Sequence, residues 1–314
     1  MSFSRGCLTG CLVVGGVFLL FPASGDAAGS LSDNSAQAHR LSTGKPAQVK
    51  TPRAHKRRVP PRPAPPEGIL LKDLTTGEIL FQENADQPMA PASLTKIMSA
   101  IVILEEGNLD DDVTVSRRAA AAHRTKLYLK PGQVLPLRGL LQAMLIRSAN
   151  DACLAAVEHV ARDEDAFVEK MNAKAMAIGL TRTHFRNACG FDMPEHYSTA
   201  EELAALTEYA MAQETFAAIV KEPSAVIRTI DQRRTYVART TNRLLGTMDG
   251  VIGVKTGFTR GAGRCLIAVV SREEKELLLV LLNARHRWGR AQDLIAYGLG
   301  SPAPPRSRPH ANPN

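Results

Sequence analysis

Apolar and polar positions divide the chain into a periodic middle part and two ends without periodicity. Two short apolar runs, residues 69–71 and 79–81, flank the turn residues 75–77, a pattern typical of a β-hairpin. Apolar residues then recur with helical spacing over residues 93–104, 137–146, 152–160 and 165–178. The string Ser198-Thr199-Ala200-Glu201 is a capping box, which predicts that a further helix begins there.

The last third of the chain favours strands. Its β-rich runs are 251–255, 265–270 and 277–282, and a final helix is expected over 289–297. Strands at both ends with helices between them predict an α+β domain. We expect an antiparallel sheet in which the N-terminal hairpin lies beside the C-terminal strands.

The N-terminus has the composition of an export signal. Arg5 precedes an apolar run over 12–21, and small residues follow at 23–28. The run is shorter than the roughly 20 apolar residues that a membrane span needs. We therefore expect a secretory signal over 1–28, cleaved near Ala27.

The next segment, residues 29–66, is expected to be a disordered tether. It carries seven prolines and eight basic side chains against one acid, Asp33, and almost no large apolar residue. Such a segment cannot bury enough apolar surface to offset the entropy of ordering it. A folded body over 67–300 follows, and the proline-containing residues 301–314 are expected to form a loose tail.

The net charge of +8 belongs to these ends. Eleven of the 39 basic residues and two of the 31 acidic residues lie outside 67–300, which leaves 28 bases and 29 acids in the body. A nearly neutral body does not favour nucleic-acid binding. The basic cluster 56–58 is best interpreted as part of a solvated linker.

Cysteine and histidine spacing indicates no metal site. Three cysteines, Cys153, Cys189 and Cys265, remain after the expected cleavage, without a Cys-x-x-Cys pair. The default interpretation is that they are small buried hydrophobes, although one disulfide of unassigned pairing is possible in an oxidising compartment. The histidines show no ligand spacing, so we expect neither a metal nor another cofactor.

Three short strings carry the chemistry. They are Ser93-Leu94-Thr95-Lys96, Ser148-Ala149-Asn150 and Lys255-Thr256-Gly257, placed at a predicted helix start, a break between helices and a predicted edge strand. Ser93 and Lys96, one helical turn apart, face the same side. A serine hydroxyl needs a neighbouring base to become nucleophilic. Lys96 can be that base if burial and a second cation, Lys255, lower its pKa.

The other motif residues complete an acyl-transfer site. Ser148 can relay a proton, and Asn150 supplies amide donors and an acceptor. Thr256 adds a hydroxyl, and Gly257 permits close approach of substrate. The backbone amides of Ser93 and Phe258 are expected to form the oxyanion hole.

Longer phrases around these strings carry a family resemblance. The phrases are 91–98, 148–152, 196–200, 241–245 and 253–259. Over about residues 67–300 the chain resembles the D-alanyl-D-alanine carboxypeptidases, which are low-molecular-mass penicillin-binding serine peptidases. The resemblance implies a β-lactamase/transpeptidase-like fold, with an antiparallel sheet flanked by helices and a helical subdomain.

The resemblance also implies roles for the site residues. Ser93 is the expected acyl-enzyme nucleophile, Lys96 its proton acceptor, and Ser148 and Asn150 the rest of the catalytic centre. Lys255, Thr256, Gly257 and Phe258 are expected to bind substrate. The family usually holds the terminal carboxylate with an arginine near the last strand. Arg287 is the expected one, with Arg285 and Arg290 as rivals.

The implied reaction is attack on the penultimate D-Ala carbonyl of a peptidoglycan stem peptide, release of D-Ala and then hydrolysis. The expected partners are stem peptides and β-lactams, which acylate the same serine, and the expected location is the periplasm or the extracytoplasmic cell wall. We expect no stable membrane anchor, because no amphipathic helix follows the body. Short relatives include endopeptidases that cut cross-links, so cleavage of cross-links is the alternative.

Three alternative functions are disfavoured, two because their sequence motifs are absent and one because the chain carries residues that it would not require. A β-lactamase often carries Glu-x-x-Leu-Asn and a Ser-His-Asp hydrolase Gly-x-Ser-x-Gly, and neither string occurs. A catalytically silent peptidoglycan-binding protein would not require the nucleophile Ser93 or the lysines Lys96 and Lys255.

Overall fold

The computed structural model describes residues 66–302. The expected export signal, and nearly all of the expected tether and tail, lie outside the described residues. Within 66–302, no helix combines the length and the apolar character needed to cross a membrane.

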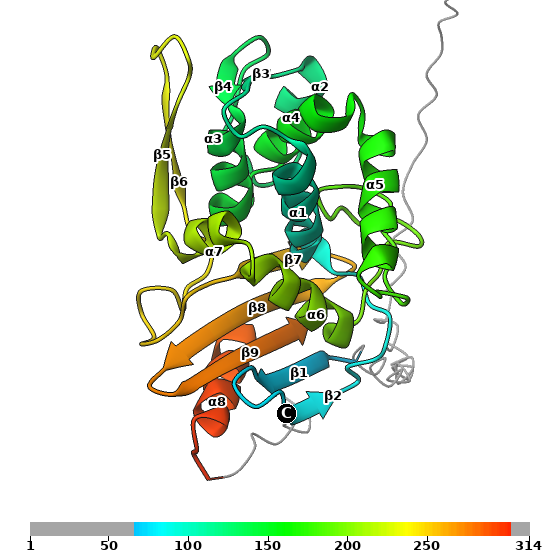
Figure 1. The fold of residues 1–314 in the computed structure, drawn as a ribbon, viewed down its shortest axis with the longest axis vertical. Helices are drawn as coiled ribbons and strands as arrows, with labels where there is room; N and C mark the ends of the chain where they lie inside the picture. The colour runs from blue at the N-terminus through cyan, green and yellow to red at the C-terminus, as the bar shows by residue number, and fades with distance from the viewer. Residues whose placement is uncertain (1–65, 303–314) are drawn as a thin grey trace, which may run out of the picture. The chain divides into compact units, whose positions relative to one another are not determined.

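A five-stranded antiparallel sheet organises the described part, in the order β2-β1-β9-β8-β7 (Figure 1). The strands are β1 (Gly68–Asp73), β2 (Ile79–Glu83), β7 (Lys255–Thr259), β8 (Gly263–Arg272) and β9 (Lys275–Leu282). β1 pairs with β9 from Gly68 opposite Leu282 to Asp73 opposite Leu277. The predicted hairpin and its place beside the C-terminal strands are confirmed, and β7 forms one edge.

Both faces of the sheet are covered, which explains the continuous apolar run in β9. Leu277, Leu279 and Leu281 pack with α8 (Arg287–Gly298), whereas the alternating residues of β9 pack with the helices on the other face. Successive side chains of a strand point to opposite faces, so a strand buried on both sides needs apolar residues throughout. Figure 1 shows α6 and α8 on opposite faces.

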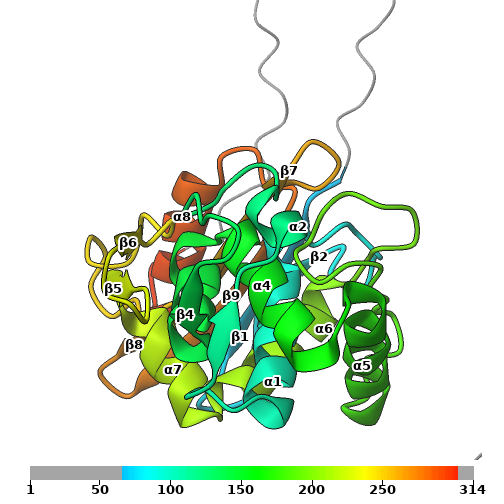
Figure 2. The same ribbon diagram turned by 90° about the horizontal axis from the view of Figure 1, so that it is seen from above.

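The helices between β2 and β7 form the second part of the fold. They are α1 (Lys96–Glu106), α2 (Arg117–Ala120), α3 (Leu137–Gln142), α4 (Asn150–Ala161), α5 (Glu164–Ala177), α6 (Ala200–Met211) and α7 (Glu214–Lys221). α1 is the central helix, because every residue from Lys96 to Ile103 is buried. Figure 2 shows α5 on one side of α1 and α4, and the β5–β6 hairpin on the other.

Two small sheets accompany the helices. One pairs β3 (Asp112–Thr114) with β4 (Val134–Pro136), and the other pairs β5 (Ser224–Arg228) with β6 (Thr235–Arg239). Neither sheet was predicted, because strands of three to five residues give too few alternations to stand out.

Three local predictions need correction. The helix expected from Ser93 begins as a tight 3-10 turn, η1 (Ala92–Thr95), and becomes α-helical only at Lys96. The strand expected over 251–255 begins at Lys255, because the positive φ of Gly253 (156°) interrupts the run and Val251 forms only an isolated bridge to Val270. The N-cap of α6 is Thr199, not Ser198, and its Oγ1 accepts from the Glu202 amide.

The cysteines differ from the default interpretation. Cys153 of α4 and Cys189 form a disulfide with Cα atoms 6.2 Å apart, whereas Cys265 is free and buried. The pairing could not be assigned from spacing, because 36 positions separate the two cysteines and only the packing of α4 brings them together.

Candidate active site

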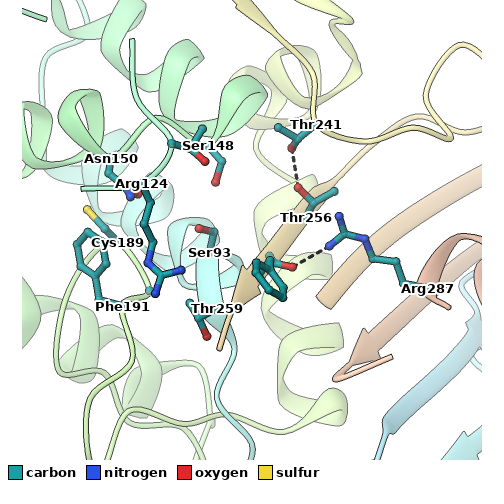
Figure 3. A pocket seen from close by; sticks show the side chains of 14 residues that line it. Ser93, Arg124, Ser148, Asn150, Cys189, Phe191, Thr241, Thr256, Thr259 and Arg287 are labelled. Atoms are coloured by element: carbon teal, nitrogen blue, oxygen red, sulfur yellow. Dashed lines mark hydrogen bonds between the residues drawn. The ribbon is translucent and has the colours of Figure 1, made fainter. Parts of the chain in front are cut away.

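The three motifs meet at one pocket of about 230 Å³ (Figure 3). Residues of η1, of the break before α4 and of β7 form its walls, together with α8 and three loops, which contribute 124–125, 189–191 and Thr241. The lining residues are Ser93, Arg124, Thr125, Ser148, Asn150, Cys189, Gly190, Phe191, Thr241, Thr256, Gly257, Phe258, Thr259 and Arg287. Lys96 and Lys255 are buried beside this lining. The structure therefore brings together all the sequence-predicted site residues.

Two glycines allow the Ser93 turn to fit between its neighbours. A Cβ on Gly257 of β7 would lie 3.2 Å from the Ser93 amide nitrogen and 3.0 Å from the Ala92 Cβ. A Cβ on Gly190 would collide with the Ala92 carbonyl, 2.0 Å from its oxygen, and Gly190 has a φ of 81°. Gly257 therefore allows η1 to pack closely against β7. This packing role was not predicted from the sequence, which indicated only a role in the approach of substrate.

Lys96 is held by three oxygen atoms. Its Nζ lies 3.2 Å from Ser93 Oγ, 2.8 Å from Asn150 Oδ1 and 2.5 Å from the carbonyl oxygen of Cys189. The side chain is fully buried. The amide and carbonyl oxygens can only accept hydrogen bonds, whereas the serine hydroxyl can also donate.

This arrangement suits a neutral amine. A neutral Nζ has two N–H donors for Asn150 and Cys189, and its lone pair is then directed at the Ser93 hydroxyl. Burial lowers the pKa of Lys96 well below its usual value, the positive charge of Lys255 lowers it further, and Glu164 opposes both. The same lysine can therefore take up a proton from Ser93.

A sharp break after α3 places Ser148 and Asn150. The helix continues as a π-turn over Ala143–Arg147, and Ser148 then takes a left-handed conformation with φ 64° and ψ 31°. Asn150 begins α4, and its Nδ2 donates to the His123 carbonyl at 2.7 Å. The buried Ser148 Oγ has no hydrogen-bond partner among residues 66–302. A buried hydroxyl without a partner at a pocket wall is available to a ligand or a proton.

Lys255 lies on β7 at the other side of Ser93. Its ammonium donates to the Thr256 carbonyl at 3.1 Å, and the side chain is 1% exposed. Burial lowers the pKa of Lys255 to about 7, and the charge of Arg287 contributes to the shift. The neighbouring Thr256 hydroxyl lies 2.5 Å from the Thr241 hydroxyl, so the pocket wall here is polar.

Of the three candidate arginines, the structure brings Arg287 to the pocket. It stands at the first position of α8, and its Nη1 donates to the carbonyls of Gly257 (2.8 Å) and Cys265 (3.0 Å). Its Nε is buried without a partner among the described residues. Arg290 approaches Glu83 at 3.5 Å instead, and neither Arg290 nor Arg285 lines the pocket.

Phe258 forms part of the rim. Its ring is 54% exposed, with the Arg264 guanidinium 5.9 Å from the ring centre. Its neighbour Thr259 donates a short hydrogen bond to Asp192, which also accepts from the Gly261 amide at 3.1 Å. These bonds fix the end of β7 against the loop that carries Cys189 and Phe191.

No cluster of metal-ligating side chains occurs within residues 66–302. The buried His196 illustrates a structural role: its Nδ1 accepts from the Arg186 amide at 2.9 Å, so its Nε2 donates to Thr95 Oγ1 at 2.8 Å. Burial lowers the pKa of His196 to about 4, so the imidazole is neutral at physiological pH.

Sequence reasoning missed seven of the residues that line the pocket, among them Cys189, Thr241 and Arg124. Cys189 acts through its backbone carbonyl, which no side-chain motif can reveal. Thr241 belongs to a phrase that the resemblance rests on, yet its contact with Thr256 requires the fold. Arg124 lies in a loop without periodicity, and the only sequence signal is its place shortly before the apolar positions Leu127 and Leu129.

Comparisons with known proteins found a matching family and several similar relatives. The family model Peptidase_S11, D-alanyl-D-alanine carboxypeptidase, matches residues 60–286. The chain is 32% identical to D-alanyl-D-alanine carboxypeptidase DacF of Bacillus subtilis, covering 69% of this chain and 57% of the relative. It is 35% identical to DacC of Escherichia coli, covering 73% and 60%. The chain thus matches less than two thirds of the length of these two relatives.

A solved structure adds information on the fold and on a ligand. The structure is similar to penicillin-binding protein D2 of Listeria monocytogenes in its ampicillin-bound form, with a TM-score of 0.65 and 28% identity over 76% of this chain and all of that chain. The predicted α+β, transpeptidase-like fold is thereby confirmed. Given the family match over most of the body, the chain belongs to the D-alanyl-D-alanine carboxypeptidase family of serine peptidases.

Proposed function

We propose that this protein is a serine-type D-Ala-D-Ala carboxypeptidase that removes the terminal D-Ala from peptidoglycan stem pentapeptides. The observation that carries the proposal is the set of contacts around Lys96. The oxygens of Asn150 and Cys189, which can only accept hydrogen bonds, hold the two N–H groups of neutral Lys96. The lone pair of Nζ then faces the Ser93 hydroxyl, with Nζ 3.2 Å from Oγ. A binding protein would have no need to bury an amine against a serine in this way.

The geometry supports the following acylation step. Ser93 Oγ attacks the carbonyl carbon of the penultimate D-Ala, and its proton passes to Lys96 Nζ. The tetrahedral oxygen accepts from the Ser93 and Phe258 amides. When the C–N bond breaks, the leaving amine takes a proton from Lys96, for which the unpartnered Ser148 hydroxyl is the relay. Free D-Ala and an ester at Ser93 result.

Hydrolysis repeats the same proton movements. Lys96, neutral again after acylation, takes a proton from a water molecule that attacks the ester carbonyl. The proton then returns to Ser93 Oγ as the C–O bond breaks, which releases the shortened peptide and restores the enzyme. One base thus serves both half-reactions.

We call the wall formed by β7 and Arg287 the strand side of the pocket. In this proposal it binds the C-terminal carboxylate of the substrate. Arg287 and Lys255 supply positive charge, and the Thr256 hydroxyl can donate to the carboxylate. Arg287 uses Nη1 for the Gly257 and Cys265 carbonyls, which fixes the guanidinium and leaves Nη2 for a ligand.

Covalent labelling with a fluorescent penicillin tests the proposal. The ampicillin complex of the Listeria relative supports reaction with β-lactams. We expect the purified protein to be labelled and Ser93→Ala to abolish the label, because the variant lacks the attacking oxygen. Ser271→Ala, on β8 and outside the pocket, is the matched control and should be labelled normally. Labelling of Ser93→Ala at the wild-type level would overturn the assignment.

The family membership also supports an extracytoplasmic location. We propose that residues 1–28 direct export and that residues 29–66 connect the body to the cleavage point, as the apolar run and the proline-rich basic composition indicate. Cleavage of cross-linked peptides by the same site is the alternative substrate choice. Incubation with intact and with cross-linked muropeptides separates the two, because the first releases D-Ala and the second yields cut dimers.

A further inference from the structure

An unassigned arginine, Arg124, faces the pocket from the side opposite Arg287. Figure 3 shows its side chain beside Phe191 and Ser93, whereas Arg287 approaches from beyond Thr256. Arg124 is exposed, and no residue between 66 and 302 makes a hydrogen bond or ion pair with its guanidinium. None of the residues that line the pocket is acidic. A ligand therefore meets a free guanidinium here.

The backbone of Arg124 is fixed in an unfavourable conformation. Its φ is 65°, in the left-handed region that costs a non-glycine residue on the order of 1 kcal/mol. The carbonyls on either side are tied to Asn150: His123 O accepts from Asn150 Nδ2 at 2.7 Å, and Thr125 O accepts from the Asn150 amide at 2.8 Å. A strained backbone conformation persists only where surrounding interactions hold it in place, and such conformations are concentrated at ligand sites.

The rest of the loop is held equally firmly. The buried carboxylate of Asp151 accepts from the Leu127 amide through Oδ1 and from the Leu129 amide through Oδ2, both at 3.0 Å. Asn150 also accepts from Lys96 at 2.8 Å. Asn150 thus anchors the segment that carries Arg124 and also orients Lys96. The backbone of Arg124 therefore has a fixed position relative to Ser93.

We propose that Arg124 is a specificity-determining residue that binds a carboxylate in the acyl-donor half of the substrate. The inference rests on the proposed function: with the terminal carboxylate at Arg287, the peptide preceding the scissile bond extends past Ser93 toward Asn150, Phe191 and Arg124. A guanidinium pairs with a carboxylate through two parallel hydrogen bonds. The preferred substrates are then peptides with a free carboxylate in the side chain preceding the D-Ala pair, over their amidated counterparts.

Two penicillins that differ in one side-chain carboxylate test this assignment. The side chain of a penicillin lies on the acyl-donor side of the β-lactam carbonyl, so an added carboxylate there probes Arg124. The measurement is the ratio of second-order acylation rates, carboxylated over uncharged. We expect Arg124→Gln to lower this ratio about tenfold, because a charge-assisted pair of hydrogen bonds is lost, and Arg124→Lys to retain part of it.

Lys126 provides the matched control. It lies two residues away, outside the pocket lining, with its ammonium 5.3 Å from the Tyr128 ring centre. Lys126→Gln removes the same charge from the same loop, and the ratio should stay within twofold of wild type. An unchanged ratio in Arg124→Gln, or an equal fall in Lys126→Gln, would overturn the carboxylate site alone. Failure of both penicillins to acylate Ser93 in the wild-type protein would overturn the proposed function and this inference with it.

Discussion

The two sides of the pocket differ in how many hydrogen-bond partners hold the basic groups nearest to Ser93. On the helical side, Lys96 Nζ is surrounded by Ser93 Oγ, Asn150 Oδ1 and the Cys189 carbonyl within 3.2 Å. On the strand side, the Lys255 ammonium has one acceptor among the described residues, the Thr256 carbonyl at 3.1 Å, and Arg287 keeps a buried Nε without a partner.

The difference matches the two tasks of a peptidase site. A proton-transfer pair gains from fixed geometry, since a misplaced base loses rate steeply. A binding surface gains from donors that the protein leaves unused, because a ligand carboxylate can then satisfy them. The disulfide from Cys153 to Cys189 reinforces the helical side, because it ties α4 to the residue whose carbonyl holds Lys96.

Replacement of Lys96, the proposed base on the helical side, should have the largest effect on the acylation rate. In Lys96→Arg the positive charge remains, but a guanidinium does not give up its proton in proteins. We expect penicillin acylation of Ser93 to fall about 10³-fold, within the range that general-base catalysis contributes. The rate is measured by quenched labelling, with a thermal melt to verify folding.

A conservative replacement elsewhere serves as the control. Lys72→Arg, in the ion pair with Glu208 on β1 and α6, should acylate at the wild-type rate. A nearly normal rate in Lys96→Arg would assign the proton acceptor to another group and would remove the distinction between the two sides.

Substitution on the strand side should weaken substrate binding, and its effect should be smaller than that of Lys96→Arg. Arg287→Gln removes the charge proposed to hold the terminal carboxylate, along with two bonds to backbone carbonyls. We expect the preference for peptides ending in a free carboxylate over C-terminal amides to fall about 10- to 100-fold, since hydrogen bonds to charged groups contribute about 1.5–3 kcal/mol. Arg285→Gln, outside the pocket, is the control, and equal losses in both variants would contradict the assignment.

Sequence reasoning was more successful for the sheet and the motif positions than for what supports them. The continuous apolar run in β9 and the turn before β2 reveal a buried strand and a hairpin, because both are local patterns. The carbonyl of Cys189 and the side chain of Asn150 reach Lys96 through tertiary packing, over separations of 93 and 54 residues. Backbone groups and long-range contacts leave no periodic signal in a sequence. The motif residues of the helical side could therefore be predicted from the sequence, but the contacts that hold them could not.

The electrostatic link between the two sides predicts a change in pH dependence. The Lys255 charge lowers the pKa of Lys96, and the proposed acylation step requires neutral Lys96, so the rate should rise with pH through the Lys96 pKa. Lys255→Gln removes that charge, which raises the Lys96 pKa and moves the acidic limb of the profile toward higher pH. At a fixed pH on that limb we expect the acylation rate to fall about tenfold.

Lys255→Arg separates this effect from the loss of binding. It keeps a positive charge that does not titrate, so the acidic limb should stay near its wild-type position. The Lys255 pKa of about 7 predicts that wild-type acylation weakens again as this ammonium loses its proton, and Lys255→Arg should remove that decline. Superimposable acidic limbs in wild type and Lys255→Gln, measured as acylation rate against pH, would show that the two sides titrate independently.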